Sequence, residues 1–261
     1  MQHSSYNKSI IPKGIEPRLY RENMGRKRFK SFAIGYKDSD LWIGIDPLSF
    51  EERMKQFAQQ KLVELRTSLE KYIEIHPEFA NSFVPIKLLP EAPPIAITMH
   101  NAAKTAHIGP MAAVAGAFSE FIGKALQQEF IINEIAIENG GDIYVSVKEN
   151  ITISVYAGES LLSNKVGIEV LAAETPLGIC TSAGTVGPSV SMGNADAVVV
   201  ACKNTALADA FATAIGNNVL SGNEIENALQ ITESQCEILS LFIICEQKLG
   251  IKGKFNFKLM S

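Results

Sequence analysis

The stretch Glu138-Asn139-Gly140-Gly141-Asp142-Ile143 decides how the fold is interpreted. Apolar and β-branched residues lie on both sides of it, which predicts two strands, residues 131–138 and 142–148, joined by a tight turn. Asn-Gly is the strongest short signal for a β-hairpin. The second glycine and the aspartate go beyond what a hairpin needs, because they let a ligand approach the backbone and place a carboxylate beside it. The stretch therefore predicts a hairpin and, as a second interpretation, a ligand-binding turn.

The other strands and helices are predicted outward from this turn. A capping box from Ser49 to Glu52 predicts a helix that ends near His76 and Pro77. Gly109-Pro110 opens a second long helix, with proline in the first turn. Residues 85–94 are expected to be a proline-rich connection and residues 101–106 a loop. A third helix is expected at 204–217. Further strands are predicted at 28–46, as a hairpin that turns at 37–40, and at 151–156, 166–171, 177–182, 196–202 and 238–245.

The order of these elements predicts an α+β fold rather than a series of βαβ units. We expect a single domain over residues 1–261, built from two similar sheet-plus-helix halves, roughly 15–90 and 95–250, that share one core. A chain of 261 residues is long enough to bury such a core.

Composition excludes several classes of function. The formal net charge is −4, whereas a dedicated nucleic-acid-binding protein usually has a strongly basic balance. No apolar run approaches the ~18 residues that a membrane-spanning helix needs. The first residues lack the apolar segment of a signal peptide, so we expect a cytoplasmic protein. The four cysteines have no metal-binding spacing, which fits free thiols in a reducing compartment.

Asp209 and Thr213 are the first candidate metal ligands. They stand four residues apart, so both side chains project from one face of the predicted helix. A carboxylate and a hydroxyl, completed by backbone carbonyl and water, are oxygen ligands of the kind that Mg²⁺ uses. The alternative is a structural role, with Asp209 favourable near the positive end of the helix and Thr213 bonded to a backbone carbonyl.

The segment Cys180-Thr181-Ser182-Ala183-Gly184-Thr185 ends a predicted strand and enters a loop rich in glycine and serine. Such loops supply backbone N–H groups and hydroxyls that bind an anion. Cys180 at the mouth of this loop is expected to be partly exposed, near groups that favour the thiolate. The alternative is an inert thiol; Cys202 and Cys245, in apolar runs, are interpreted as buried.

Two further sets of residues are ambiguous. The basic residues between Arg18 and Lys30, including Arg21 and Arg28, are interpreted as a solvated strand face, with contact to phosphates as the alternative. His100 and His107 flank the predicted loop at 101–106, from which they could reach a site.

Three motifs in the same order resemble the flavin-transferase (ApbE-like) superfamily: ENGGDI at 138–143, the Thr181-Ser182 loop, and ADAFATA at 208–214. The resemblance implies a duplicated sheet-and-helix (T-fold-like) domain, which binds FAD and Mg²⁺ and transfers FMN to a hydroxyl of a target protein. The longer segments GPMAAVAGAFSEFIG and ICTSAGTVGPSVSMGNADAVVV are similar to a short branch of that superfamily found in methanogens and anaerobic bacteria.

The resemblance implies roles for individual residues. Asp209 and Thr213 match the metal ligands, Asn139 to Asp142 match the flavin-contacting turn, and Thr181 and Ser182 match the TSG loop, with Ala183 inserted before the glycine. Two family features are missing: Val114-Ala115-Gly116 stands where transferases have A-K-G, and residues 186–191 lack the histidine and aspartate that follow the TSG loop. The scaffold is therefore expected to be retained and flavin transfer to be lost or replaced.

Two hypotheses follow. In the first, Asp209 and Thr213 hold Mg²⁺ while residues 139–142 and 181–185 bind FAD or another nucleotide. In the second, the thiol-carrier hypothesis, Cys180 carries a persulfide, and the resemblance to the short branch implies an accessory role in anaerobic sulfur assimilation. A protein partner or a homo-oligomer is compatible with both, because the helix at 111–125 is rich in small residues.

Overall fold

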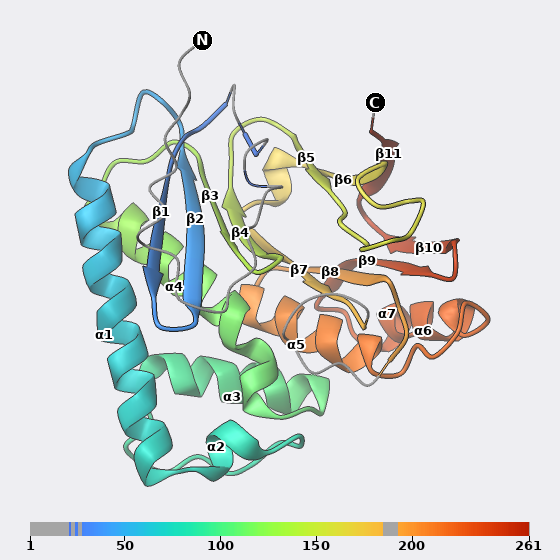
Figure 1. The fold of residues 1–261 in the computed structure, drawn as a ribbon, viewed down its shortest axis with the longest axis horizontal. Helices are drawn as coiled ribbons and strands as arrows, with labels where there is room; N and C mark the ends of the chain where they lie inside the picture. The colour runs from blue at the N-terminus through green and yellow to red at the C-terminus, as the bar shows by residue number, and fades with distance from the viewer. Residues whose placement is uncertain (1–20, 22–23, 26–27, 185–192, 261) are drawn as a thin grey trace.

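An eight-stranded antiparallel sheet forms the centre of the computed structural model, which describes residues 21, 24–25, 28–184 and 193–260 (Figure 1). The strand order is β1-β2-β3-β4-β7-β8-β9-β10. These strands are β1 (Lys30–Tyr36), β2 (Ser39–Ile45), β3 (Ile135–Asn139), β4 (Asp142–Ser146), β7 (Leu177–Ser182), β8 (Ala197–Cys202), β9 (Ile238–Cys245) and β10 (Lys248–Gly253).

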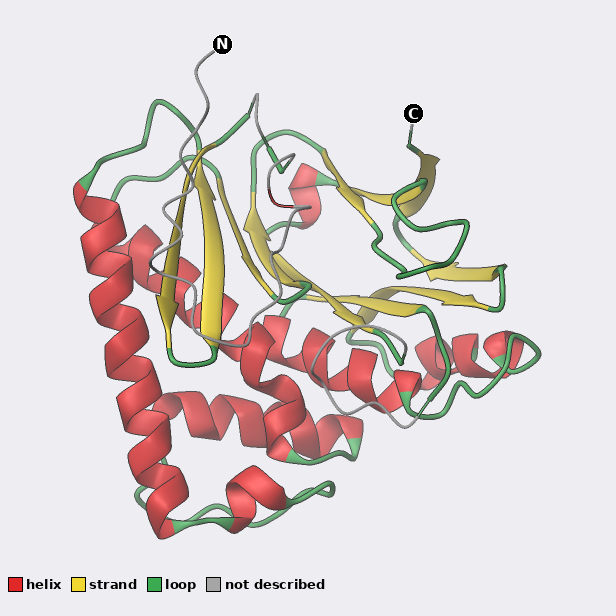
Figure 2. Ribbon diagram, viewed as in Figure 1, coloured by secondary structure: helices red, strands yellow, loops and turns green. Residues whose placement is uncertain are grey.

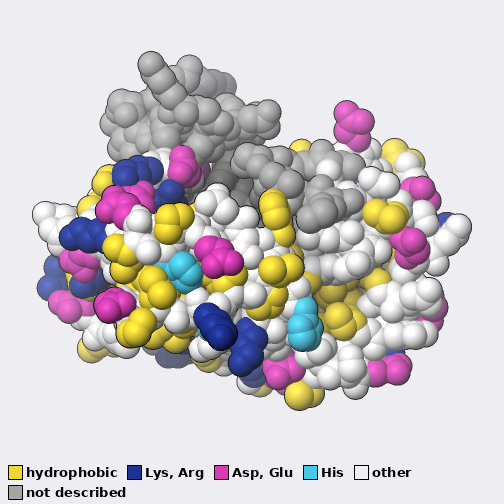
Figure 3. Space-filling model, turned by 90° about the horizontal axis from the view of Figure 1, so that it is seen from below, with side chains coloured by type: hydrophobic (Ala, Val, Ile, Leu, Met, Phe, Trp, Pro, Cys, Tyr) yellow, Lys and Arg dark blue, Asp and Glu magenta, His cyan; other side chains and the backbone are white. Residues whose placement is uncertain are grey.

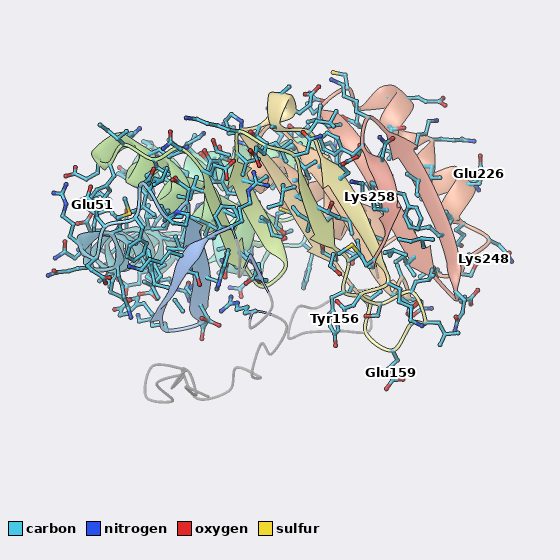
Figure 4. All side chains as sticks on the ribbon, turned by 90° about the horizontal axis from the view of Figure 1, so that it is seen from above. Glu51, Tyr156, Glu159, Glu226, Lys248 and Lys258 are labelled. Atoms are coloured by element: carbon cyan, nitrogen blue, oxygen red, sulfur yellow. The ribbon has the colours of Figure 1, made fainter. Side chains whose placement is uncertain are left out.

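Helices cover one face of this sheet and a small sheet covers part of the other (Figure 2). The small sheet has the order β11-β6-β5, with β5 (Ile151–Ser154), β6 (Val166–Val170) and β11 (Asn256–Leu259). The small sheet lies at the β7–β10 end of the large sheet. Seen from above, Lys258 of β11 and the residues Tyr156 and Glu159 between β5 and β6 are far from Glu51, which precedes α1 (Figure 4). The helices are α1 (Arg53–Ile75), α2 (Glu78–Asn81), α3 (Pro94–Ala106), α4 (Val114–Glu129), α5 (Thr205–Gly216), α6 (Ile225–Leu229) and α7 (Ile231–Ser234), with short 3₁₀ turns at Pro110–Ala113 and Ala172–Glu174.

The two faces of the sheet belong to two hydrophobic cores. Successive side chains of a strand point to opposite faces. On β8, Val198 and Val200 therefore join the core under the helices, whereas Val199 and Ala201 join the core under the small sheet. Both faces are buried, which explains why β8 and β9 are continuous apolar runs rather than alternating ones.

The predicted hairpin at 139–142 is present. Asn139 pairs with Asp142, and the two glycines between them have φ angles of 70° and 102°. Residues that carry a side chain rarely adopt these backbone angles, so the turn requires glycine at both positions. The α+β class and the third helix are also confirmed, as α5 begins at Thr205 and ends at Gly216.

The structure corrects three expectations. Residues 101–106 are not a loop, because they form the second half of α3. Ser49 does not cap α1: its hydroxyl accepts hydrogen bonds from the backbone and side-chain nitrogens of Asn133 (both 3.0 Å), and α1 begins at Arg53 without a side-chain cap. The duplicated halves are not confirmed, since a division near 90–95 would separate β1 and β2 from the rest of one continuous sheet.

Within the described ranges, none of the helices combines the length and the apolar character needed to span a bilayer.

Candidate functional site

Two buried aspartates from distant parts of the chain form the centre of the candidate site. Asp142 is the first residue of β4, directly after the glycine turn, and Asp209 lies in the middle of α5. Their exposed fractions are 7% and 8%. The start of α4 lies between them, because its backbone contacts both the turn and α5.

Asp209 is held by the beginning of α4. Its Oδ2 atom accepts a hydrogen bond from the backbone N–H of Gly116, at 2.9 Å. A Cβ atom on Gly116 would lie 2.5 Å from the carbonyl oxygen of Thr205 and 2.8 Å from Cβ of Asp209. Only glycine therefore fits at this crossing, and the small size of Gly116 serves close packing against α5.

Asp142 is held by its backbone, and part of its carboxylate is left without a partner. Its carbonyl oxygen accepts a hydrogen bond from the hydroxyl of Ser119 (3.0 Å). In the same turn, the side-chain amide of Asn139 donates to the carbonyl of Ala115 (3.2 Å). The Oδ1 atom of Asp142 is buried and has no hydrogen-bond partner among the described residues. Such an atom is costly unless a ligand completes it.

Burial and mutual repulsion disfavour two negative charges at this site. Burial raises the pKa of Asp209 to about 7, although the backbone N–H groups of Gly116 and Ala115 act in the opposite direction. Burial also raises the pKa of Asp142 well above its ordinary value, and the neighbouring Asp209 carboxylate raises it further. Within the part of the chain that the structure describes, neither carboxylate is paired with a positive charge, so the arrangement suits a bound cation.

Cys180 lies beside this pair, but the expectation of a partly exposed thiolate is wrong. The side chain is fully buried, and its Sγ atom donates to the carbonyl oxygen of Thr205 at 3.3 Å. Burial raises the pKa of the thiol well above its usual range, and the carboxylates of Asp142 and Asp209 raise it further. In return, the neighbouring Cys180 thiol acts to lower the pKa of Asp142, against the larger effect of burial.

The predicted anion-binding loop is only partly supported. Thr181 lies next to the glycine turn, 3.7 Å from where a Cβ of Gly141 would be. Ser182 packs against Gly216, at the end of α5. The N–H group of Gly184 donates to the carbonyl of Ala195 (2.9 Å), so this N–H is not free to bind an anion as expected. Thr185 lies outside the described residues.

The positions of Thr213, His100 and His107 in the structure do not decide their roles. Thr213 is half-buried, one turn after Asp209 on α5, and its carbonyl accepts a hydrogen bond from Asn217. His100 lies within α3, where burial and then Lys104 lower its pKa. His107 ends that helix with a φ of 55°. The role of Thr213 as a metal ligand stays a prediction.

Arg21 and Glu138 are site residues that the sequence analysis missed. Arg21 is 6% exposed and its Nε atom donates to Oε2 of Glu138 at 2.6 Å, so it does not lie on a solvated strand face. The other oxygen of Glu138, Oε1, accepts the backbone N–H of Gly141 at 2.8 Å. The only available signal was the position of Glu138, directly before the turn.

A separate cleft of about 540 Å³ lies on the helical side of the molecule. Its walls come from α1, α3 and α4, and they include Lys61, Glu120 and Lys124. The face seen from below mixes charges of both signs with hydrophobic side chains (Figure 3). None of the predicted site residues lines this cleft, so it is distinct from the aspartate pair.

Comparison with known proteins identifies the family. A family model described as "AbpE bacteria" matches residues 21–233, and the chain belongs to this family. A "UPF0280 protein" of Methanococcus aeolicus is 39% identical over 208 residues, which cover 78% of this chain and 84% of that protein. Another from Methanocaldococcus jannaschii is 38% identical over 223 residues, covering 84% and 88%.

A solved structure supports the fold. The apo form of the flavinyl transferase ApbE of Pseudomonas stutzeri superposes with a TM-score of 0.52 at 12% identity, covering 86% of this chain and 94% of that one. At this identity the likeness concerns the fold alone. Together with the family match, it confirms the resemblance to the ApbE-like superfamily.

Proposed function

We propose that this protein binds Mg²⁺ together with the diphosphate of a nucleotide such as FAD, at the site formed by Asp142 and Asp209. The observation that carries the proposal is the buried Oδ1 atom of Asp142, which has no partner in the described structure and lies beside a second buried carboxylate. Two neighbouring buried carboxylates, one of them with an unpartnered oxygen among the described residues, are matched better by a cation than by a neutral or anionic ligand.

The chemistry of the donors suits magnesium. Mg²⁺ is commonly bound by one or two carboxylates and completes its octahedron with water and substrate phosphates. Among the described residues, no group of three or more His, Cys, Asp or Glu side chains could hold a metal, which disfavours a closed all-protein site of the zinc type. Asp142 and Asp209 would hold the ion, with Thr213 as the third candidate. When bound, the ion would neutralise the charge of a diphosphate.

The neighbouring turn suits the rest of a nucleotide. Gly140 is exposed and Gly141 half-buried, so a ligand can approach their backbone without meeting a side chain. The similarity to a structure titled flavinyl transferase supports FAD as the first nucleotide to test. Transfer of FMN is not part of the proposal, because no lysine stands at Val114-Ala115-Gly116. The other departure, at residues 186–191, lies outside the described residues.

Metal binding predicts a rise in thermal stability. A ligand at ~100 times its Kd stabilises by about 2.7 kcal/mol, which corresponds to roughly 5–10 °C in Tm for a chain of this size. We expect this rise with MgCl₂ in the wild-type protein, measured against EDTA by differential scanning calorimetry. Asp142→Asn and Asp209→Asn should abolish it. Asp196→Asn changes a half-buried aspartate just before β8 that is outside the proposed metal ligands; it is the matched control and should retain the rise.

The nucleotide is tested separately, by isothermal titration of FAD with and without Mg²⁺. Binding that requires both the metal and Asp209 supports the proposal. A wild-type protein whose Tm is the same in MgCl₂ and EDTA contradicts it, as does an Asp209→Asn variant that keeps the full rise. The burial of Cys180 does not favour the thiol-carrier hypothesis, which stays a prediction together with a protein partner, a homo-oligomer and a cytoplasmic location.

A further inference from the structure

Arg21 joins two hairpins at the edge of the candidate site. Its Nη1 atom donates to Oδ2 of Asp40 (2.8 Å) and its Nη2 atom to the carbonyl oxygen of the same residue (2.8 Å). Its Nε atom donates to the carboxylate of Glu138, and Nη2 also reaches the carbonyl of Glu138 at 3.5 Å. Asp40 is the second residue of β2, next to the hairpin turn. Strand β2 pairs with β3 (Figure 1).

A second hydrogen bond joins Glu138 to the Asn139–Asp142 turn. One carboxylate oxygen of Glu138 faces Arg21, and the other accepts the N–H of Gly141, the residue before Asp142. Glu138 is 1% exposed, so this link is shielded from water. The two glycines of the turn have positive φ angles and no side chains with which to anchor it. The position of the turn therefore depends on hydrogen bonds such as this one.

We propose that Arg21 is a positioning residue, which through Glu138 fixes the Asn139–Asp142 turn in the geometry that presents Asp142 to a divalent cation. The inference rests on the proposed function, because it assigns Arg21 to the same site. Arg21 touches neither carboxylate of the aspartate pair in the described contacts; it acts through Glu138 and Gly141. Such supporting residues commonly change metal affinity by ~10–100-fold when they are replaced.

Arg28 provides a natural comparison within the same sheet. Its Nε and Nη2 atoms donate to the two carboxylate oxygens of Glu134 (2.8 and 2.6 Å), and further N–H groups reach the carbonyls of Glu149 and Asn150. Glu134 directly precedes β3, and Glu138 lies near its other end. Both arginines therefore anchor β3, but only Arg21 anchors the end that carries the turn.

Lysine cannot replace arginine here. The guanidinium of Arg21 serves acceptors on two residues in different directions, Asp40 and Glu138, from one planar group. A lysine ammonium at the same place keeps the charge but is a single point that cannot reproduce this planar fork. Arg21→Lys thus separates the contribution of charge from that of geometry.

The test compares Arg21→Gln and Arg21→Lys with Arg28→Gln by isothermal titration with MgCl₂, using the full-length chain. We expect Arg21→Gln to weaken Mg²⁺ binding about 10-fold or more, and Arg21→Lys to be weakened in the same direction. Arg28→Gln is expected to lower Tm while changing the Mg²⁺ affinity by less than about 2-fold, because a general loss of sheet stability does not displace the turn. If Arg21→Gln fails to fold, Arg21→Lys keeps the comparison.

Amide hydrogen exchange at Gly141, measured by NMR, provides a second readout that does not require metal. We expect exchange to be faster in the Arg21 variants than in Arg28→Gln at matched global stability. The inference is overturned if the Arg21 variants keep wild-type Mg²⁺ affinity, if Arg28→Gln loses as much affinity, or if exchange at Gly141 is unchanged. A wild-type protein that binds no Mg²⁺ contradicts the proposed function instead, and exchange at Gly141 then decides separately whether Arg21 holds the turn.

Discussion

At the scale of the residue, the aspartate pair shows how function and stability oppose each other. Asp142 and Asp209 would be costly if both were charged without a counter-ion, and burial raises the pKa of each. A site that served stability alone would place apolar residues or a paired arginine here. Arg21 is nearby, but it is paired with Glu138 and Asp40 rather than with these carboxylates. Among the described residues the pair has no cationic partner, and the bound cation that we propose would supply one.

The burial of Cys180 predicts slow reaction with thiol reagents. We expect iodoacetamide to modify the exposed Cys236 in the native protein, and Cys180 only when the protein unfolds, because Cys180 is fully buried and its pKa is raised. Peptide mass spectrometry with and without urea measures this. A Cys236→Ser variant is the control for reagent access.

The same experiment bears on the thiol-carrier hypothesis. Persulfide loading at Cys180 in the native protein would require the thiol to meet a sulfur donor. Rapid modification of Cys180 under native conditions would contradict the burial described above and would revive that hypothesis.

At the scale of the element, three of the four long helices and the strands other than β10 and β11 were predicted, whereas the long helix α3 and the short helices α2, α6 and α7 were not. Strands 177–182 and 238–245 are predicted with the same bounds that the structure has, because continuous β-branched and aromatic runs suit strands buried on both faces. Helix α3 was missed because the residues it buries are mostly small. Ile95, Met99, Ala102, Ala103 and Ala106 keep helical spacing, but alanines give a weak hydrophobic signal and His100 and Asn101 interrupt it.

The junction between β2, α1 and β3 depends on Asp46, and this predicts a pH effect. Its Oδ1 atom accepts the N–H of Ser49 (3.1 Å), and its Oδ2 atom accepts those of Asn133 (3.2 Å) and Glu134 (3.1 Å). Burial raises the pKa of Asp46, but hydrogen bonds from Ser49, Glu134 and Asn133 outweigh this and lower it overall. The charged form is thus favoured by folding.

Because the folded-state pKa of Asp46 is depressed, its contribution is present above the unfolded pKa of ~3.9 and is lost as pH falls through the folded value. We expect Asp46→Asn to reduce the free energy of unfolding by roughly 2 kcal/mol at pH 7, the scale of hydrogen bonds to a charged group. The loss should shrink at pH 3. Urea denaturation at both pH values measures it.

Asp38→Asn is the matched control, since Asp38 is 88% exposed and pairs with Arg66 at the surface. Such pairs contribute about 0–1 kcal/mol. A loss for Asp46→Asn that is equal at pH 7 and pH 3, or no greater than that of Asp38→Asn, would contradict this account of the junction.

At the scale of the whole molecule, the continuous sheet predicts cooperative unfolding. We propose that the chain is a single domain, because β3 and β4 connect the β1–β2 hairpin to the strands that follow. Trp42, the only tryptophan, is buried in β2 against Phe29, whereas the buried Cys202 lies in β8. We expect Trp42 fluorescence and the exposure of the Cys202 thiol to change at the same urea concentration. Two separate midpoints would indicate two independently folding units.

The sequence by itself determined the strands other than β10 and β11, three of the four long helices and the glycine turn. Each of these depends on local preferences: the period of apolar residues, the positive φ of glycine and the restrictions of proline. The motifs also carried the resemblance to the ApbE-like superfamily, which the family match confirms.

Only the tertiary structure decided which of these residues meet. It placed Asp142 beside Asp209, which lies 67 residues later, buried Cys180, and joined Arg21 to Glu138 across 117 positions. The physical reason is that burial, pKa and ion pairing depend on neighbours in space, and sheet pairing brings together segments whose separation along the chain leaves no local signal. Arg21 and Arg28 both lie in the same basic stretch of sequence, and their partners, Glu138 in β3 and Glu134 just before it, distinguish the proposed positioning residue from one that supports the sheet.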